Sequence, residues 1–362
     1  MLRLLLSGYY GFGNLGDEAL LELTIRELRR RHPQLAIDVL SHEPEATSRR
    51  YGVESTPRAD LGAVRAAIGR ADLVLSGGGG LLQNATSTRS LLYYTGVIRA
   101  AIRAQKPAMI FAQSIGPLDA VGRFMVREMC RGLRRATVRD ETSRALLERI
   151  LPKVLVERTA DPVWMLERSD ADFDLEAEGL GADSDPLAIV CVRKIPAFER
   201  GVRAMAAAVD QLSARGAKVA FLPLGGPDDA EASTTVIRAC SSAPVLLPAF
   251  ELEKAAHVIG RAQAVIGMRL HAVIIAARLG VPFLAIPYDP KVSSLCAQLA
   301  WPLPPLWEPN KRGSGTDLDN VRALVDRLWD ERESLRVQLA SQLDKMRALA
   351  QRNFDVVDEL LA

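Results

Sequence analysis

The stretch GYYGFGNLGDEALL, residues 8–21, decides the fold and raises the first question about function. It follows the apolar run LRLLLS, and its glycines have the G-x-G-x-x-G spacing of a turn from a strand into a nucleotide-binding helix. Asp17 and Glu18, however, lie at the start of that helix, where carboxylates would repel a pyrophosphate. The stretch therefore predicts a Rossmann-like α/β unit. Dinucleotide binding is the weaker alternative. Glu43 supports it, because this acid follows the turn at about the distance of the acid that binds the ribose.

The composition limits the classes of function. The 362 residues suffice for two domains of about 100–200 residues each. A net charge of +2 with scattered basic residues predicts no nucleic-acid partner. Four cysteines without a C-x-x-C pair predict a reducing compartment, with no metal or disulfide framework. The N-terminal apolar run is too short for a signal sequence, and no stretch reaches the ~18 apolar residues of a membrane span. We expect a cytoplasmic protein with a small-molecule partner.

Short runs rich in Val, Ile and Leu alternate with stretches of helical period, which is typical of parallel sheets covered by helices. The first group of predicted strands covers residues 2–7, 36–41, 71–77, 107–114, 136–140 and 154–158. The second group covers residues 187–192, 218–225, 244–248, 263–268 and 282–288. The fold class is therefore α/β, with two facing Rossmann-like domains that bind ligands at the carboxyl ends of their strands.

The acidic stretch 169–185 lacks basic residues and predicts an exposed connection between the domains. We expect an N-terminal domain over residues 1–168, on the side of the acceptor substrate, and a C-terminal domain over residues 186–340. Residues 341–362 are predicted to form a helix that can pack back on the N-terminal domain.

The first turn contains candidate site residues beside its glycines. Asp17 has two interpretations, a cap of the following helix or a site carboxylate that takes a proton from a sugar hydroxyl. Asn14 is a candidate substrate-binding residue in the same turn. Glu18 is interpreted as helix surface.

Two later turns of the first domain offer further candidates. The stretch SGGGGLLQN, residues 76–84, carries Gly78 and Gly79, which leave room for a substrate or merely allow a flexible turn. Arg139 ends another strand, where it either binds an anion or pairs with Asp140.

The second domain holds a sharper group of residues in GMRLHAVIIAARLGVPFLAIPYDPKV, residues 267–292. Arg269 and His271 begin an apolar helix, and Lys291 follows the next strand, which together predict an anion site. The alternatives are a hydrogen-bonded core histidine and a solvated lysine. No Asp or Glu lies between His257 and Tyr288, so the stretch lacks the acid that often binds a nucleotide ribose.

Taken together, these stretches resemble the polysaccharide pyruvyl transferases, most closely the CsaB type. The motifs that carry the resemblance are GYYGFGNLGDEALL, SGGGGLLQ, QSIGP, VRDETS, DPV at residues 161–163, and the block at 267–292. The resemblance implies a glycosyltransferase-B-like fold. It also implies phosphoenolpyruvate as donor and N-acetylmannosamine of a lipid-diphosphate-linked cell-wall precursor as acceptor. It places the family's functional residues at Asp17, Arg139, His271 and Lys291. Ser114 departs from the glycine that relatives often have.

A mechanism follows from the charges of the donor. Phosphoenolpyruvate carries a carboxylate and a phosphate. Arg139, Arg269, His271 and Lys291 could bind these two groups. Asp17 is the candidate base, and His271 or Lys291 the candidate acid or phosphate partner. No cofactor or metal is expected, and contact with the inner membrane face would be transient. The competing functions are a nucleotide-sugar glycosyltransferase and a non-catalytic sensor of a phosphorylated metabolite.

Overall fold

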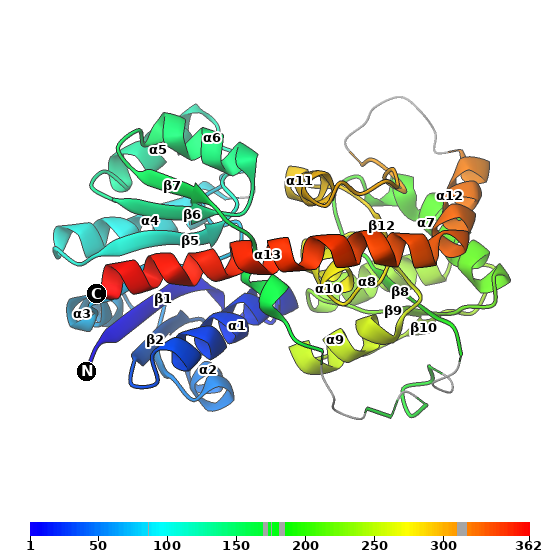
Figure 1. Ribbon diagram of the computed structural model, residues 1–362, viewed down its shortest axis with the longest axis horizontal. Coiled ribbons are helices and arrows are strands. Elements are labelled where there is room, and N and C mark those ends of the chain that lie inside the picture. Colours follow the sequence, from blue (N-terminus) through cyan, green and yellow to red (C-terminus); the bar gives the residue numbers. More distant parts are fainter. Residues whose placement is uncertain (86, 169–172, 175, 181–184, 310–316) are drawn as a thin grey trace. The chain divides into compact units, whose positions relative to one another are not determined.

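Two parallel sheets organise the chain, each at the centre of its own α/β unit (Figure 1). The computed structural model describes residues 1–85, 87–168, 173–174, 176–180, 185–309 and 317–362. Unit 1 comprises Met1–Met165 and Lys345–Ala362, and unit 2 comprises Leu166–Asp344. Most of the connection predicted over residues 169–185 lies outside the described residues.

The sheet of unit 1 has seven strands in the order β3-β2-β1-β4-β5-β6-β7, and neighbouring strands run parallel. Its strands are β1 (Arg3–Tyr10), β2 (Ala36–Ser41), β3 (Glu54–Pro57), β4 (Leu73–Ser76), β5 (Ala108–Gln113), β6 (Arg135–Val138) and β7 (Leu155–Arg158). Its helices are α1 (Leu15–Arg31), α2 (Pro44–Tyr51), α3 (Leu61–Arg70), α4 (Thr88–Arg103), α5 (Ala120–Met129), α6 (Glu141–Ile150) and the 3₁₀ turn η1 (Pro162–Met165).

The strands predicted in this half are confirmed, but β3 was not predicted. Its sequence, ESTP, lacks an apolar run, and it lies at the edge of the sheet where only Thr56 is buried. An edge strand needs little apolar surface and tolerates proline, so hydrophobic periodicity does not reveal it.

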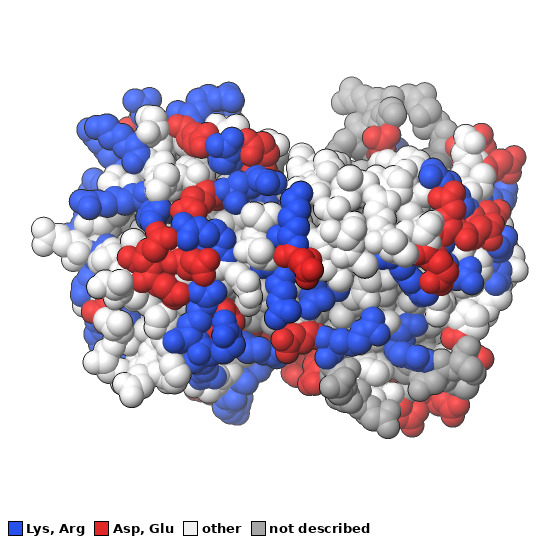
Figure 2. All heavy atoms as spheres, in the orientation of Figure 1, with Lys and Arg blue, Asp and Glu red and all other residues white. Residues whose placement is uncertain are grey.

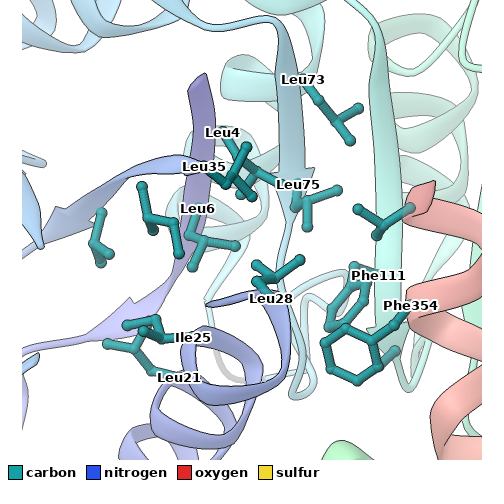
Figure 3. Close-up of a cluster of buried hydrophobic side chains, with 14 of the residues drawn as sticks. Leu4, Leu6, Leu21, Ile25, Leu28, Leu35, Leu73, Leu75, Phe111 and Phe354 are labelled. Carbon is teal, nitrogen blue, oxygen red and sulfur yellow. The ribbon is translucent and has the colours of Figure 1, made fainter. Parts of the chain in front are cut away.

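Alternate residues of β1 pack on opposite faces of the sheet, as the two-residue period of a strand requires. Leu4 and Leu6 belong to a buried cluster with residues of α1, whereas Leu5 belongs to a cluster with residues of α3 and α4. Figure 3 shows the first cluster, where Phe111 of β5 lies beside Phe354. Both faces of the central strands are therefore buried, which explains their continuous apolar sequences.

The last helix, α13 (Arg332–Leu361), begins in unit 2 and ends in unit 1 (red in Figure 1). Within unit 1, the ring of Phe354 meets that of Phe111 edge to face at 5.3 Å between centroids. Arg31 of α1 donates to Asp355 at 2.7 Å and to Asp358 at 2.6 Å. The end of α13 therefore contributes a buried aromatic side chain and two ion pairs to unit 1.

The sheet of unit 2 has five strands in the order β10-β9-β8-β11-β12, again parallel. The strands are β8 (Leu187–Cys191), β9 (Lys218–Phe221), β10 (Val245–Leu246), β11 (Ala264–Gly267) and β12 (Phe283–Ala285). The helices are α7 (Phe198–Ala214), α8 (Pro227–Ile237), α9 (Leu252–Arg261), α10 (Leu270–Arg278), α11 (Pro290–Gln298) and α12 (Leu318–Asp330). All the strands predicted in this half are confirmed.

Each sheet has one point where the order of strands reverses direction. In unit 1 this switch point lies between β1 and β4, and in unit 2 it lies between β8 and β11. Open α/β sheets bind ligands beyond the carboxyl ends of the strands at such points, because the following turns diverge there. The turns after these strands are therefore where each unit is expected to bind a substrate.

Candidate functional site

The switch point of unit 1 is formed by the turn before α1 and the glycines after β4. Asn14 caps α1, since its side-chain oxygen accepts from the backbone N–H of Gly16 at 3.1 Å. Asp17 lies half-buried in the first turn of the helix. A Cβ atom added to Gly79 would lie only 2.9 Å from Oδ1 of Asp17. The Asp17 carboxylate therefore lies directly against the glycine turn of the neighbouring strand.

The space beside the glycines at 77–79, where a side chain would lie, is filled by other side chains of the same unit. A Cβ atom at Gly77 would clash with the Tyr10 hydroxyl, and one at Gly78 would lie 3.1 Å from the Leu20 side chain. Gly79 has a φ of +99°, which side chains rarely adopt. Gly78 and Gly79 are both buried. The glycine run thus allows β4 to approach α1 closely and brings its backbone to Asp17.

Glu18 is buried, so its interpretation as helix surface was wrong. It is 9% exposed, and its carboxylate accepts from the Gly11 N–H and from the Tyr51 hydroxyl, both at 2.8 Å. Burial, with the adjacent Glu18 charge, raises the pKa of Tyr51. The carboxylate ties the glycine turn to α2, a role that the spacing of acids along one helix does not reveal. Of the two acids in the opening stretch, Glu18 holds the turn.

Arg139 lies at the end of β6 and is only 5% exposed. It forms a buried ion pair with Asp161, and its Nη2 donates to the Gly79 carbonyl and to the Ser114 hydroxyl, each at 3.1 Å. Asp140, the partner considered from the sequence, caps α6 through the Ser143 N–H at 2.7 Å. Arg139 therefore joins the end of β6 to the ends of three other strands and supports the backbone that faces Asp17.

Ser114 gains a clear structural role. Its backbone N–H donates to the Gly79 carbonyl at 2.9 Å, and its hydroxyl accepts from Arg139. A glycine at this position could form the first of these bonds but not the second. The departure from the usual family residue thus adds a contact to the Arg139 network.

The switch point of unit 2 contains Arg269 at the N-cap position of α10. Its guanidinium forms a bidentate pair with the fully buried Asp229, at 2.8 Å from Nε and 2.6 Å from Nη2. The group crosses Gly225, where a Cβ atom would overlap it. Asp229 was not predicted because it lies on α8, 40 residues earlier in the chain. Arg269 is therefore a cation whose charge is balanced within the protein.

His271 lies half-buried in the first turn of α10, and Lys291 lies half-buried in the first turn of α11. Their strands, β11 and β12, are parallel neighbours, as expected from the sequence. Asp289 caps α11 through the Lys291 N–H at 3.0 Å, and its second oxygen lies 3.3 Å from the Lys291 ammonium nitrogen. The structure thus brings His271, Arg269 and Lys291 to neighbouring strand ends of unit 2, while the other predicted residues belong to unit 1.

Arg193 was missed from the sequence, although it directly follows the predicted strand that ends at Val192. Its Nη1 donates to the Tyr288 hydroxyl at 2.8 Å, and its guanidinium lies 5.1 Å from the centre of that ring. Its backbone N–H also contacts the sulfur of Met268 at 3.3 Å. Arg193 therefore lies at the switch point itself, and its side chain extends to the end of β12. Arg193 becomes a candidate only when the order of the strands is known, and the sequence does not show that order.

The two switch points differ in the charge at the start of their central helices. The first turn of α1 contains two carboxylates, whereas the first turn of α10 contains none. The Asn14 side chain accepts a hydrogen bond from a backbone N–H in the first turn of α1. The Arg269 side chain contains only donors, so it cannot cap α10 in this way. The N–H groups at a helix start without a side-chain cap favour anions. An anion is therefore favoured at unit 2 and disfavoured at unit 1.

The rest of the structure adds three observations. Among the described residues, no three His, Cys, Asp or Glu side chains are grouped as metal ligands would be, and every helix is too short or too polar to span a membrane. On the face in Figure 2, Lys and Arg are interspersed with Asp and Glu and form no continuous basic stripe.

Two Rossmann-like units of this kind define the fold class shared by GT-B glycosyltransferases and related epimerases. A UDP-GlcNAc 2-epimerase from Neisseria meningitidis, bound to UDP-GlcNAc, is similar with a TM-score of 0.64, 12% identity and coverage of 100% of both chains. Anabaena Alr3699/HepE with UDP-glucose has a TM-score of 0.66 and 11% identity over 99% of this chain and 100% of that one. A glycosyltransferase from Rickettsia africae ESF-5 has a TM-score of 0.62 and 10% identity, over 99% and 98% of the chains.

The family model of polysaccharide pyruvyl transferases matches residues 14–290. The chain therefore belongs to this family and is a transferase of pyruvate to a polysaccharide. The matched region contains Asp17, Arg139 and His271, and Lys291 is the first residue beyond it. A comparison with curated protein sequences finds no significant match.

Proposed function

We propose that this transferase takes pyruvate from phosphoenolpyruvate and attaches it as a ketal across two hydroxyls of an amino sugar. The acceptor is N-acetylmannosamine in a lipid-diphosphate-linked precursor of a cell-wall polymer, as in the CsaB type. The observation that carries the proposal is the start of α10, where Arg269 is the N-cap residue, His271 lies in the first turn, and the first turn contains no acid. Such a terminus suits a compact anion.

The donor needs positive groups for a carboxylate and a phosphate. Arg193 supports this role because its side-chain hydrogen bond is to the neutral hydroxyl of Tyr288. Arg269 is already paired with Asp229, so its charge attracts an anion less strongly. We assign the anionic groups of the donor to Arg193, Lys291 and the first N–H groups of α10, with Arg269 shaping the turn.

The acceptor needs a base near one hydroxyl. Asp17 is half-buried at the start of α1, and Asn14 rather than Asp17 supplies the observed side-chain cap. We assign Asp17 as the base. Asn14, Gly78 and Gly79 form the backbone and cap around it, and Arg139 is a positioning residue because its guanidinium holds the Gly79 carbonyl.

The reaction balances with one acid and one base. His271, whose residue type changes charge near neutral pH, donates a proton to the methylene carbon of the donor. A sugar hydroxyl then bonds to the central carbon while Asp17 accepts its proton. The second hydroxyl attacks the same carbon, the bond from that carbon to the phosphate oxygen breaks, and phosphate leaves with the bonding electrons and the hydroxyl proton. Release of the Asp17 proton to water and uptake of one proton from water by His271 restore the enzyme.

Because the acceptor carries a lipid diphosphate, the proposal places the reaction at the cytoplasmic face of a membrane, through transient contact. No segment of the described chain is assigned to this contact. The donor and acceptor are therefore tested with a short-chain soluble lipid analogue.

The test measures phosphate release and the mass of the acceptor after incubation with phosphoenolpyruvate and a synthetic lipid-diphosphate-linked disaccharide that ends in N-acetylmannosamine. Phosphate release that requires both substrates, with addition of one pyruvate ketal to the disaccharide, is the expected result. An unchanged acceptor mass would contradict this donor and acceptor.

The nucleotide-sugar alternative is tested by thermal unfolding, since a ligand that binds only the folded protein raises its melting temperature. The similar structures that contain UDP or UDP-sugars motivate this comparison. We expect phosphoenolpyruvate to stabilise the protein more than uridine diphosphate does. Stabilisation by the nucleotide alone would favour a glycosyltransferase.

A further inference from the structure

Three aromatic rings form a parallel stack at the carboxyl edge of the unit 1 sheet. The rings of Tyr9 and Phe12 lie 4.1 Å apart with 9° between their planes, and those of Phe12 and His42 lie 4.4 Å apart with 4° between their planes. Tyr9 is the penultimate residue of β1, Phe12 lies in the glycine turn and His42 follows β2. Tyr9 is 39% exposed and Phe12 is 37% exposed, and His42 is also exposed.

The stack is held in place by the tightly packed turns below it. The His42 N–H donates to the Tyr10 carbonyl at 3.0 Å, which joins the two turns. Gly11 has a φ of +77°, and a Cβ atom there would lie 2.7 Å from the backbone nitrogen of Glu43. Any larger residue would separate the turns. The rings are therefore set by the backbone before a ligand arrives, which reduces the entropy lost on binding.

Arg58, which follows β3, supports the same stack. Its guanidinium lies 4.9 Å from the ring centre of Phe12 and 4.4 Å from that of Tyr93. These cation–π contacts restrain both the arginine and the central ring. The stack and Arg58 together draw on the ends of three adjacent strands of one sheet.

The stack lies close to the proposed base. Phe12 and Asp17 belong to the same turn and helix start. The guanidinium of Arg58 also lies 5.4 Å from the ring centre of Tyr94. Burial raises the pKa of Tyr94 to about 12, Arg58 opposes this rise and Asp17 adds to it. Tyr94 is thus within electrostatic range of both Arg58 and Asp17, so the stack and the base share one neighbourhood.

Contiguous exposed rings at such an edge differ from isolated surface aromatics, which are common. Ring faces favour flat, partly apolar ligands, and ligand sites combine such faces with a few polar groups. The C–H face of a pyranose has this character, while its hydroxyls project from the rim. A nucleotide stacked here would bring the diphosphate on its ribose to the acidic first turn of α1, which repels it. In the lipid-linked disaccharide, a second sugar separates the terminal N-acetylmannosamine from the diphosphate.

We propose that Tyr9, Phe12 and His42 form a platform that binds the sugar ring of the acceptor. The inference rests on the proposed function for the identity of the sugar. Tyr9 and His42 cover the two faces of Phe12. The sugar ring therefore stacks its C–H face on the outer face of Tyr9 or His42, which leaves its rim hydroxyls to be reached by Asp17. Arg58 fixes the platform from the side of β3 and is a positioning residue.

The test compares Phe12→Ala with Phe12→Tyr, which keeps the ring, and with Phe124→Ala. Phe124 is a matched control because it lies on α5 of the same unit and is 65% exposed. We expect Phe12→Ala, which removes the central ring that supports Tyr9 and His42, to raise the KM for the lipid-linked disaccharide about 10-fold. The KM for phosphoenolpyruvate should stay within about twofold, and both other variants should resemble the wild type in both constants.

Failure of the platform and failure of the proposed function give different results. If the wild-type protein transfers pyruvate and Phe12→Ala keeps the same KM for the disaccharide, the platform is wrong and the function stands. If the wild-type protein transfers none, saturation-transfer NMR with the methyl glycoside of N-acetylmannosamine tests the platform separately. Sugar signals that Phe12→Ala abolishes support it. Signals only from added uridine monophosphate, or sugar signals unchanged by the substitution, overturn it.

Discussion

The two switch points have the same topology and opposite chemistry. Each lies between two parallel strands, where a turn leads into a helix that begins at the carboxyl edge. In unit 1 that helix, α1, is capped by Asn14 and begins with Asp17 and Glu18. In unit 2 the helix, α10, follows Arg269 and contains His271 in its first turn. One fold thus places carboxylates and aromatic rings at one switch point, and an arginine and a histidine at the other.

Partners, more than residue types, distinguish the arginines of the two regions. Arg139 in unit 1 and Arg269 in unit 2 each pair with a buried carboxylate, Asp161 or Asp229. Arg193 instead contacts the ring and hydroxyl of Tyr288. A buried pair with satisfied hydrogen bonds holds local structure, whereas a cation beside a neutral ring keeps more of its attraction for an external anion.

The largest effect is expected from His271→Ala in unit 2. Loss of the acid should lower kcat by about 100- to 10,000-fold, the usual contribution of general acid–base catalysis. Steady-state phosphate release measures this, and an unchanged melting temperature shows that the fold is kept. His257→Ala, on α9 of the same unit, is the matched control and should retain activity. Near-normal turnover of His271→Ala would remove this residue from the reaction.

Arg193→Gln should act on donor binding rather than on chemistry. Removal of one charged contact to the donor is expected to raise the KM for phosphoenolpyruvate about 10- to 100-fold, with a smaller change in kcat. Lys194→Gln is the control, since that exposed neighbour pairs with Glu231 at 2.6 Å. Equal KM values for the two variants would show that Arg193 does not contact the donor.

Asp161→Asn and Asp229→Asn should each destabilise the protein by about 3–5 kcal/mol, because the first leaves the buried Arg139 and the second the half-buried Arg269 without its counter-charge. Chemical denaturation followed by circular dichroism measures the free energy of unfolding. Asp228→Asn provides the control, since Asp228 is exposed beside buried Asp229 on α8. A loss no larger than that of the control would mean that the buried pairs do not hold the two turns.

The smallest effect concerns the cysteines of the two units. Burial raises the pKa of Cys130 in unit 1 to about 12 and that of Cys296 in unit 2 to about 11. Because folding favours the protonated thiols, this stabilisation is complete below the unfolded thiol pKa of about 8.5 and is lost as pH rises through about 11–12. Ellman's reagent at pH ~8 should react slowly with the native chain and rapidly once guanidinium unfolds it. Rapid reaction of native Cys130 would contradict its burial.

Hydrophobic patterning was enough to predict the parallel sheets, since their central strands are buried on both faces. It missed β3 because an edge strand needs few apolar residues. The candidate residues at the ends of β1, β4 and β11 were also within reach of the sequence, because glycines and charged residues directly follow apolar runs. The sequence did not predict the pairs Arg139–Asp161 and Arg269–Asp229, because each joins residues that lie far apart in the chain. Arg193 required the strand order, which places β8 beside β11.

We propose that the donor binds at the switch point of unit 2. Hydrogen exchange with and without phosphoenolpyruvate, followed by mass spectrometry of peptides from the intact protein, tests it most directly. We predict slower exchange in peptides that contain Arg193 and His271, with no change in the turn that contains Phe12 and Asp17. Protection confined to that turn of unit 1, with none around His271, would contradict the claim.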